Sequence, residues 1–262
     1  MKYIRLTFIT LFCLAAVIPL LAFAQEAEDA RGAFLITRPK PSKPSGSSSA
    51  KCDRALGLGY SIYQKGPDGL PVRVNDSRSF RTGDAVRLVI EPNCTGYLYV
   101  FNAENGKDPR MIFPDPRLYG GVNRIRAHVP YEVPSSREAD QKLQWFVFDD
   151  SAATESIYLI VTLNPLPGVL TGSKLSAHCQ ANQRDCPWRP SEADWARIAA
   201  NVDVEVSVSR DQSFGQVQTG VERNSVDRGL GLPSSAPAPS VVKMNKSPKA
   251  GMLKTKVDLI HK

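Results

Sequence analysis

The sequence is poor in the residues that metal sites usually require. It contains only three histidines, His128, His178 and His261, and it has no Cys-x-x-Cys pair. Structural zinc sites combine cysteines and histidines at short, regular spacings. The sequence therefore predicts no metal site.

Motifs of common catalytic sites are missing too. There is no Gly-x-Ser-x-Gly, no glycine-rich loop that would cradle a phosphate, and no familiar arrangement of a histidine with a nucleophile. We therefore expect no cofactor and no catalytic residue. The neighbouring acids Asp149 and Asp150 follow a strand-like run and precede a turn, where solvated carboxylates are common. A secreted hydrolase that uses Asp149, Asp150 or His128 remains the alternative.

Net charge is absent from most of the chain. The formal net charge is +7, and it comes entirely from residues 1–24 and from the last twenty residues, so that residues 25–242 are neutral. A core that binds nucleic acid would carry Lys and Arg on its own face, so we expect no nucleic-acid partner.

The positive charge is concentrated at the C-terminal end. Residues 211–262 are rich in Gly, Ser, Pro and Lys, and they are predicted to form a disordered basic tail. Such a tail either aids solubility or makes weak, salt-sensitive contact with an anionic membrane or wall polymer. The lysines that would make this contact are Lys243, Lys246, Lys249, Lys254 and Lys256.

The N-terminal segment predicts export. A charged start, an apolar run from Leu6 to Phe23 and the sequence Ala22-Phe23-Ala24 are typical of a signal peptide over residues 1–24. An uncleaved membrane anchor is the alternative. Residues 25–51 are rich in Pro, Ser and Lys and are predicted to be a disordered linker. The protein is therefore expected in the periplasm or outside the cell.

Four cysteines remain after the signal, and an even number in an exported chain predicts two disulfides. Three pairings can form. We favour Cys52–Cys94 and Cys179–Cys186, because each pair lies within one apparent structural block.

Period-two apolar runs between Gly, Pro and Asn predict an antiparallel β-sandwich, Ig-like or similar, over residues 52–166. Tyr97–Ala103 is apolar on both faces and is the predicted central strand, and Leu143–Phe148 is predicted to be a further strand. Residues 167–210 are predicted to form a small α/β appendage. It comprises a disulfide loop, a short helix capped by Ser191 and a last strand around Val202–Val208, all packed on the domain.

Aromatic residues provide one candidate ligand face, formed by Tyr97, Tyr119, Tyr131 and Trp145. Packing in the core is the competing interpretation, because large aromatic side chains are usually buried. An exposed row of these rings would favour a carbohydrate-binding adhesin.

Several short motifs occur in a fixed order. They are Phe80-Arg-Thr-Gly-Asp, Gly96-Tyr-Leu-Tyr-Val-Phe, the glycine after Asn105, Ile112-Phe-Pro, Asn123-Arg-Ile and a strand before Asn164-Pro165. Over about residues 57–166, this set resembles the bacterial family called domain of unknown function 4384. The resemblance implies an exported or envelope-associated β-rich module and carries no catalytic residue. We therefore interpret the chain as a non-catalytic envelope or interaction module. Its expected partner is a protein or an envelope polymer, and its oligomeric state is open.

Overall fold

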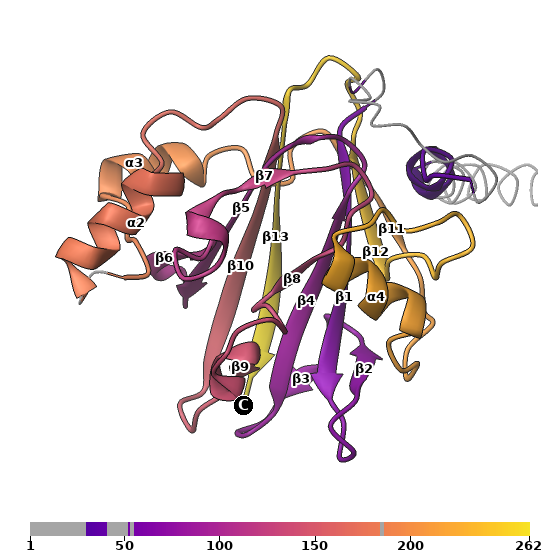
Figure 1. Ribbon diagram of the computed structural model, residues 1–262, viewed down its shortest axis with the longest axis horizontal. Helices are drawn as coiled ribbons and strands as arrows, with labels where there is room; N and C mark the ends of the chain where they lie inside the picture. The colour runs from indigo at the N-terminus through magenta and orange to yellow at the C-terminus, as the bar shows by residue number, and fades with distance from the viewer. Residues whose placement is uncertain (1–29, 41–51, 53–54, 184–185) are drawn as a thin grey trace, which may run out of the picture.

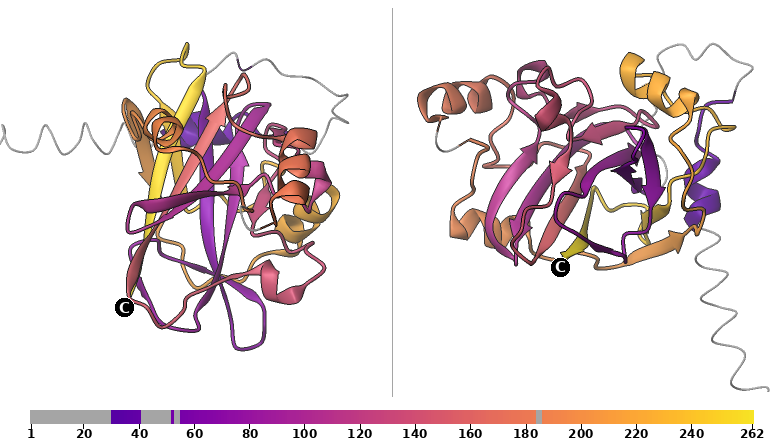
Figure 2. Two further views of the ribbon diagram at one scale, coloured as in Figure 1. Left: turned by 90° about the vertical axis from the view of Figure 1, so that its left-hand side faces the viewer. Right: turned by 90° about the horizontal axis from the view of Figure 1, so that it is seen from below.

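The computed structural model describes residues 30–40, 52, 55–183 and 186–262. Two β-sheets face each other in a sandwich, which confirms the predicted fold class (Figures 1 and 2). The first sheet has the order β11-β12-β1-β4-β8, with β2 beside β1 and β9 beside β4. Its strands are β1 (Gly57–Lys65), β2 (Pro71–Val74), β4 (Ala85–Pro92), β8 (Tyr131–Val133), β9 (Phe146–Val147), β11 (Val206–Arg210) and β12 (Val241–Asn245).

The second sheet has the order β3-β13-β10-β5-β6, with β7 beside β5. Only the short β3–β13 pair is parallel among the paired strands of the described residues. Its strands are β3 (Ser79–Phe80), β5 (Gly96–Glu104), β6 (Lys107–Phe113), β7 (Arg124–Ile125), β10 (Ala153–Thr162) and β13 (Met252–His261). The helices are α2 (Gly172–Ala181), α3 (Glu192–Ile198) and α4 (Gly220–Arg228), with 3-10 turns η1 (Tyr119–Gly121) and η2 (Gln141–Gln144).

Strand β5 is covered on both faces, as its sequence predicts. Leu98 and Val100 point into the main core between the sheets, and Tyr99 and Phe101 belong to a second cluster on the other face. In Figure 1, α2 and α3 lie on this outer side of the second sheet. Trp195 of α3 brings its ring centroid to 5.5 Å from that of Phe101. The appendage therefore completes a second hydrophobic core.

Two predictions about the appendage have different outcomes. Ser191 caps α3, because its side chain accepts a hydrogen bond from the backbone N–H of Asp194 at 3.2 Å. Helix α2 was not predicted, and the strand predicted around Val202–Val208 begins only at Val206, after a turn. Leu143–Phe148 is likewise not a continuous strand. It is split between η2 and the two-residue β9, and Val147 is 59% exposed.

The prediction of a disordered tail over residues 211–262 is wrong. This stretch forms α4, β12 and β13, and β13 pairs with β10 along its whole length (Figure 1). Leu253, Val257 and Leu259 alternate with more exposed residues and point into the main core. The sandwich consequently extends beyond residue 166, and β11, predicted as the last strand, is followed by two more. Lysines at the outward positions hid this period-two pattern.

Residues 30–40 also depart from the prediction. The linker was expected to be disordered throughout, but residues 30–35 are helical, and Phe34 packs against Val242 and Met244 of β12. The predicted signal peptide and the rest of the linker lie outside the described residues. Among the residues described, no helix is long and apolar enough to cross a bilayer.

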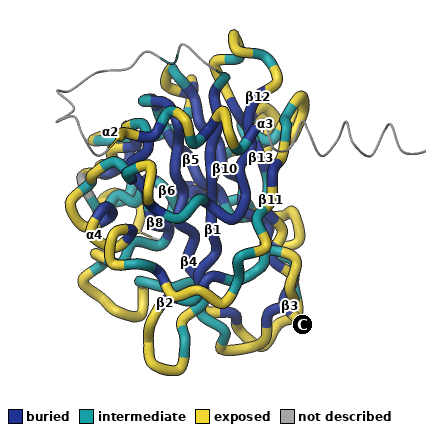
Figure 3. Tube along the Cα trace, turned by 90° about the vertical axis from the view of Figure 1, so that its right-hand side faces the viewer, coloured by how far each residue is buried: buried dark blue, intermediate teal, exposed yellow. Residues whose placement is uncertain are grey.

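The outer face of the first sheet buries charged side chains in pairs. Arg73 of β2 meets Glu222 of α4 at 2.9 Å, and Arg87 of β4 meets Glu132 of β8 at 3.4 Å. Alternation along β4 correctly predicts that Arg87 faces away from the core. It is nevertheless only 4% exposed, because other segments cover this face (Figure 3). Buried ions need such partners, because an unpaired charge is costly to remove from water.

Two buried tyrosines make the fold sensitive to alkaline pH. Burial is the main cause that raises the pKa of both Tyr60 and Tyr63 above the usual value, and the charge of Asp76 raises that of Tyr60 further. Below about pH 10 both the folded and the unfolded chain keep these protons. Above it only the unfolded chain releases them, so the free energy of unfolding falls as the pH rises. Urea midpoints measured between about pH 8 and 11 should therefore decline at the alkaline end, less steeply in Tyr63→Phe. A flat profile would contradict this assignment.

Candidate functional site

A groove of about 900 Å³ lies at one edge of the sandwich, where β8 ends the first sheet and β6 ends the second. Pockets that hold small ligands have volumes of roughly 300–1,000 Å³. One wall comes from β6 and the loop that follows it, and the other from β8 and the segment around η2. The disulfide Cys179–Cys186 and the end of α4, with Val226 and Gly229, complete the lining. The groove is thus built from segments far apart in the sequence.

The lining is largely apolar and includes two rings of the predicted ligand face. Tyr131 lies with its ring centroid 6.1 Å from that of Phe113, and its hydroxyl accepts a hydrogen bond from the backbone N–H of Arg126 at 2.8 Å. Burial raises the pKa of Tyr131, so its phenol is neutral. The Arg87 guanidinium lies over the ring of Trp145, and its central carbon is 4.1 Å from the centroid of that ring. Val122 and Leu143 add exposed apolar surface, at 54% and 41%.

Arginines give the groove a positive character. Arg124 lines it and is exposed, and its guanidinium makes no hydrogen bond or ion pair with any described residue. Arg126 also lines it, and its guanidinium donates to the backbone carbonyl of Gly229. Arg117 is held by Asp115, and the groove's other acid, Glu132, is paired with Arg87. The acids are therefore neutralised locally, and the charge that remains available to a ligand is positive.

The four aromatic residues of the predicted ligand face do not form one surface. Tyr131 and Trp145 line the groove, but Tyr97 is half-buried against the second cluster and does not line it. Tyr119 begins η1. Sequence reasoning missed the arginines, since residues 25–242 are neutral in total. The available signal in the sequence was the alternation Arg124-Ile125-Arg126, which in a strand places both arginines on the face opposite Ile125.

The predicted anionic-contact lysines are dispersed over ordered structure. Lys243 is buried, with its Nζ 2.8 Å from a carboxylate oxygen of Asp203. Lys254 donates to the carbonyls of Arg197 and Ala200, and Lys256 is paired with Asp258. Lys246 and Lys249 are exposed near the β12–β13 turn. These lysines do not form the flexible basic segment that was predicted, and contact with an anionic surface stays a prediction.

The acids of the hydrolase alternative lie in a solvated turn. Asp149 and Asp150 are exposed, and Asp149 accepts a hydrogen bond from the backbone N–H of Ser151 at 2.8 Å. Neither acid lines the groove. This is the local arrangement of an Asx turn, in which the carboxylate stabilises the backbone.

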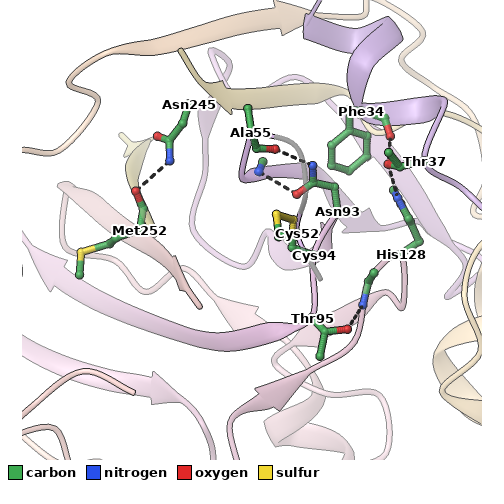
Figure 4. The surroundings of a disulfide bond; sticks show 12 residues. Phe34, Thr37, Cys52, Ala55, Asn93, Cys94, Thr95, His128, Asn245 and Met252 are labelled. Atoms are coloured by element: carbon green, nitrogen blue, oxygen red, sulfur yellow. Dashed lines mark hydrogen bonds between the residues drawn. A yellow bond between two sulfur atoms is a disulfide. The ribbon is translucent and has the colours of Figure 1, made fainter. Parts of the chain in front are cut away.

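His128 has the connections of a hydroxyl–imidazole–carboxylate relay. Its Nε2 lies 2.7 Å from the Thr37 hydroxyl, and its Nδ1 lies 2.7 Å from Glu91 (Figure 4 shows the Thr37 side). However, the Thr37 hydroxyl donates its proton to the carbonyl of Phe34 at 2.7 Å. It must then accept a hydrogen bond from His128, which leaves the imidazole unable to act as its base.

The same cluster fastens residues 30–40 to the sandwich. Arg38 donates two hydrogen bonds to the Glu91 carboxylate, at 2.8 and 2.6 Å. Arg38, Glu91 and His128 are all no more than 3% exposed. We therefore interpret this cluster as a latch for the N-terminal segment, and call it the Arg38 latch.

Both favoured disulfides are present. Cys52–Cys94 has a Cα–Cα distance of 5.3 Å and lies below the N-terminal segment, close to Asn93 (Figure 4). Asn93 stabilises the chain near this disulfide. Its side-chain oxygen accepts a hydrogen bond from the backbone N–H of Gly57, and its side-chain nitrogen donates one to the carbonyl of Ala55. Cys179–Cys186 has a Cα–Cα distance of 5.4 Å and contributes to the groove. Stable disulfides are typical of oxidising compartments, which is consistent with the predicted export.

Comparison with protein families returned one result. Residues 79–165 match the model of a domain of unknown function, DUF4384. The resemblance predicted from the motifs is thereby confirmed over this stretch. Neither the search of curated proteins nor that of solved structures found a match. The DUF4384 stretch runs from β3 through most of the groove to β10, whereas α4, β13 and the Cys179–Cys186 wall lie outside it.

Proposed function

We propose that this protein is an exported, non-catalytic binding module whose ligand occupies the groove. The observation that carries the proposal is the combination of an apolar lining with a cation, Arg124, that has no partner among the described residues. Ligand sites are typically concave, mostly apolar and supplied with a few polar groups that fix orientation. The DUF4384 match adds no activity of its own.

Among the residues described, the two alternatives have less support than a ligand in the groove. A hydrolase based on Asp149 and Asp150 would have its acids in an exposed turn away from the groove. A carbohydrate-binding adhesin would need an exposed row of aromatic rings. In this groove the Tyr131 hydroxyl already accepts a hydrogen bond from Arg126, and Arg87 covers one face of the Trp145 ring. A groove ligand is therefore the function we favour.

Binding in the groove can be tested with N-phenyl-1-naphthylamine, an uncharged dye whose fluorescence rises in apolar sites. We expect saturable binding to the full chain, weakened about tenfold or more in Val122→Asp, because an apolar ligand would have to cover the new carboxylate. Val204→Asp is the matched control, since Val204 is 58% exposed and Val122 54%, and Val204 does not line the groove. Binding that is absent, or equally weakened in both variants, would refute the proposal.

A further inference from the structure

The geometry points to an anionic amphiphile as the ligand: a single apolar chain that carries a carboxylate or phosphate head group. This inference rests on the proposed function, because it names the ligand class of the same groove. The chain would lie along the apolar lining, and the head group would pair with Arg124, with Arg126 close by in sequence.

Charge complementarity sets the sign of the head group. Arg117, Arg124, Arg126 and Arg137 line the groove, and its two acids are each paired with an arginine. An ammonium head group would therefore meet no unpaired carboxylate among the described residues of the lining. A carboxylate or phosphate suits the planar guanidinium of Arg124, which can donate two parallel hydrogen bonds to either group.

The strand edges favour an amphiphile over an extended peptide. Peptides that enter such grooves often add a strand to an open sheet edge and pair with its backbone. Here Glu132 and Val133 of β8 are only 7% and 1% exposed, so the backbone of this edge is covered. On the opposite wall, the N–H of Met111 in β6 already donates to the carbonyl of Trp188 at 2.9 Å. An alkyl chain needs no backbone partners and can use the apolar surface that remains.

Four dodecyl compounds that differ in the head group distinguish the alternatives. Dodecanoate, dodecyl phosphate, dodecanol and dodecylamine would each be titrated below the concentration at which they form micelles, against protein loaded with N-phenyl-1-naphthylamine. We expect the two anions to displace the dye at concentrations about tenfold lower than dodecanol, with dodecylamine the weakest. The advantage of the anions should shrink at high salt, because the Arg124 site is exposed to solvent.

Variants of Arg124 locate the head group. Arg124→Gln should remove most of the tenfold advantage of dodecanoate and leave dodecanol unchanged, and Arg124→Lys should retain part of it. Arg81→Gln is the control, because Arg81 is also exposed, its guanidinium makes no hydrogen bond or ion pair with a described residue, and it does not line the groove. Circular dichroism would check that the variants fold.

The outcomes separate this inference from the proposed function. If the dye binds but the anions have no advantage, or if Arg124→Gln weakens all four compounds equally, the inference is wrong and the binding module stands. If dodecanoate alone among the two anions binds, the head group is a carboxylate, and if dodecyl phosphate alone binds, it is a phosphate; either result supports the inference. If the dye does not bind at all, the proposed function itself fails.

Discussion

A chain that stops at Val242 should not fold. It would lack β13, a ten-residue strand that pairs with β10 throughout and lies between β10 and β3 in the second sheet. Leu253, Val257 and Leu259 would be lost from the main core. At roughly 1.5–3 kcal/mol for each buried aliphatic side chain, the loss is about 5–9 kcal/mol, comparable with the whole stability of a typical domain.

The measurement is the far-ultraviolet circular dichroism and the urea unfolding of the shortened chain. We expect no cooperative transition, together with aggregation through the newly exposed edge of β10. The control is the full chain with Lys249→Gln, which removes one exposed positive charge and keeps both strands. This variant should unfold like the unmodified protein. A soluble shortened chain with an unchanged midpoint would show that β13 is dispensable.

Breaking the Arg38 latch should have the second-largest effect. Glu91→Gln leaves the Arg38 guanidinium buried without a negative partner, and it also removes the acceptor charge beside His128. Losing one partner of a buried ion pair typically costs about 3–5 kcal/mol. Urea denaturation should show this loss, and amide hydrogen exchange should show that residues 30–40 become less protected.

Two further variants separate charge from packing. Arg38→Met combined with Glu91→Leu replaces the pair with apolar groups and should recover part of the stability, because the unpaired Arg38 charge is removed while His128 still lacks its Glu91 partner. Lys40→Ala, in the same segment but exposed, should have little effect. A cost below about 1 kcal/mol for Glu91→Gln would mean that the pair is not essential to the latch.

The strand periodicity of residues 57–104 was readable in the sequence because it depends on local alternation. Leu58, Tyr60 and Ile62 face one core, and β5 is apolar on both sides because two different cores lie against it. The two disulfides were also predictable, since each pair lies within one block of the chain. The N-terminal cap of α3 was predictable as well, because it depends only on Ser191 and on the first turn of the helix that follows it.

The C-terminal strands were misread for a physical reason. β13 alternates apolar residues with Lys254, Lys256 and Asp258, and a lysine-rich composition with prolines nearby is also typical of disorder. What makes it a strand is the partner β10, which is about ninety residues earlier in the chain. Composition reports local preference, whereas pairing of distant strands depends on the complete sheet.

The sequence by itself determined the β-rich class and the central strand, because alternation is a local property. It favoured the disulfide pairs among three possible pairings, because each pair lies within one block of the chain. Only the tertiary structure decided that Arg73, Arg87 and Glu91 are buried, because their positions face outward and the covering segments come from elsewhere in the chain. It also decided where the groove lies and that Arg124 has no partner there among the residues that the structure describes. A neutral total charge contains no information about which charges meet, and that pairing is set by the packing of distant segments.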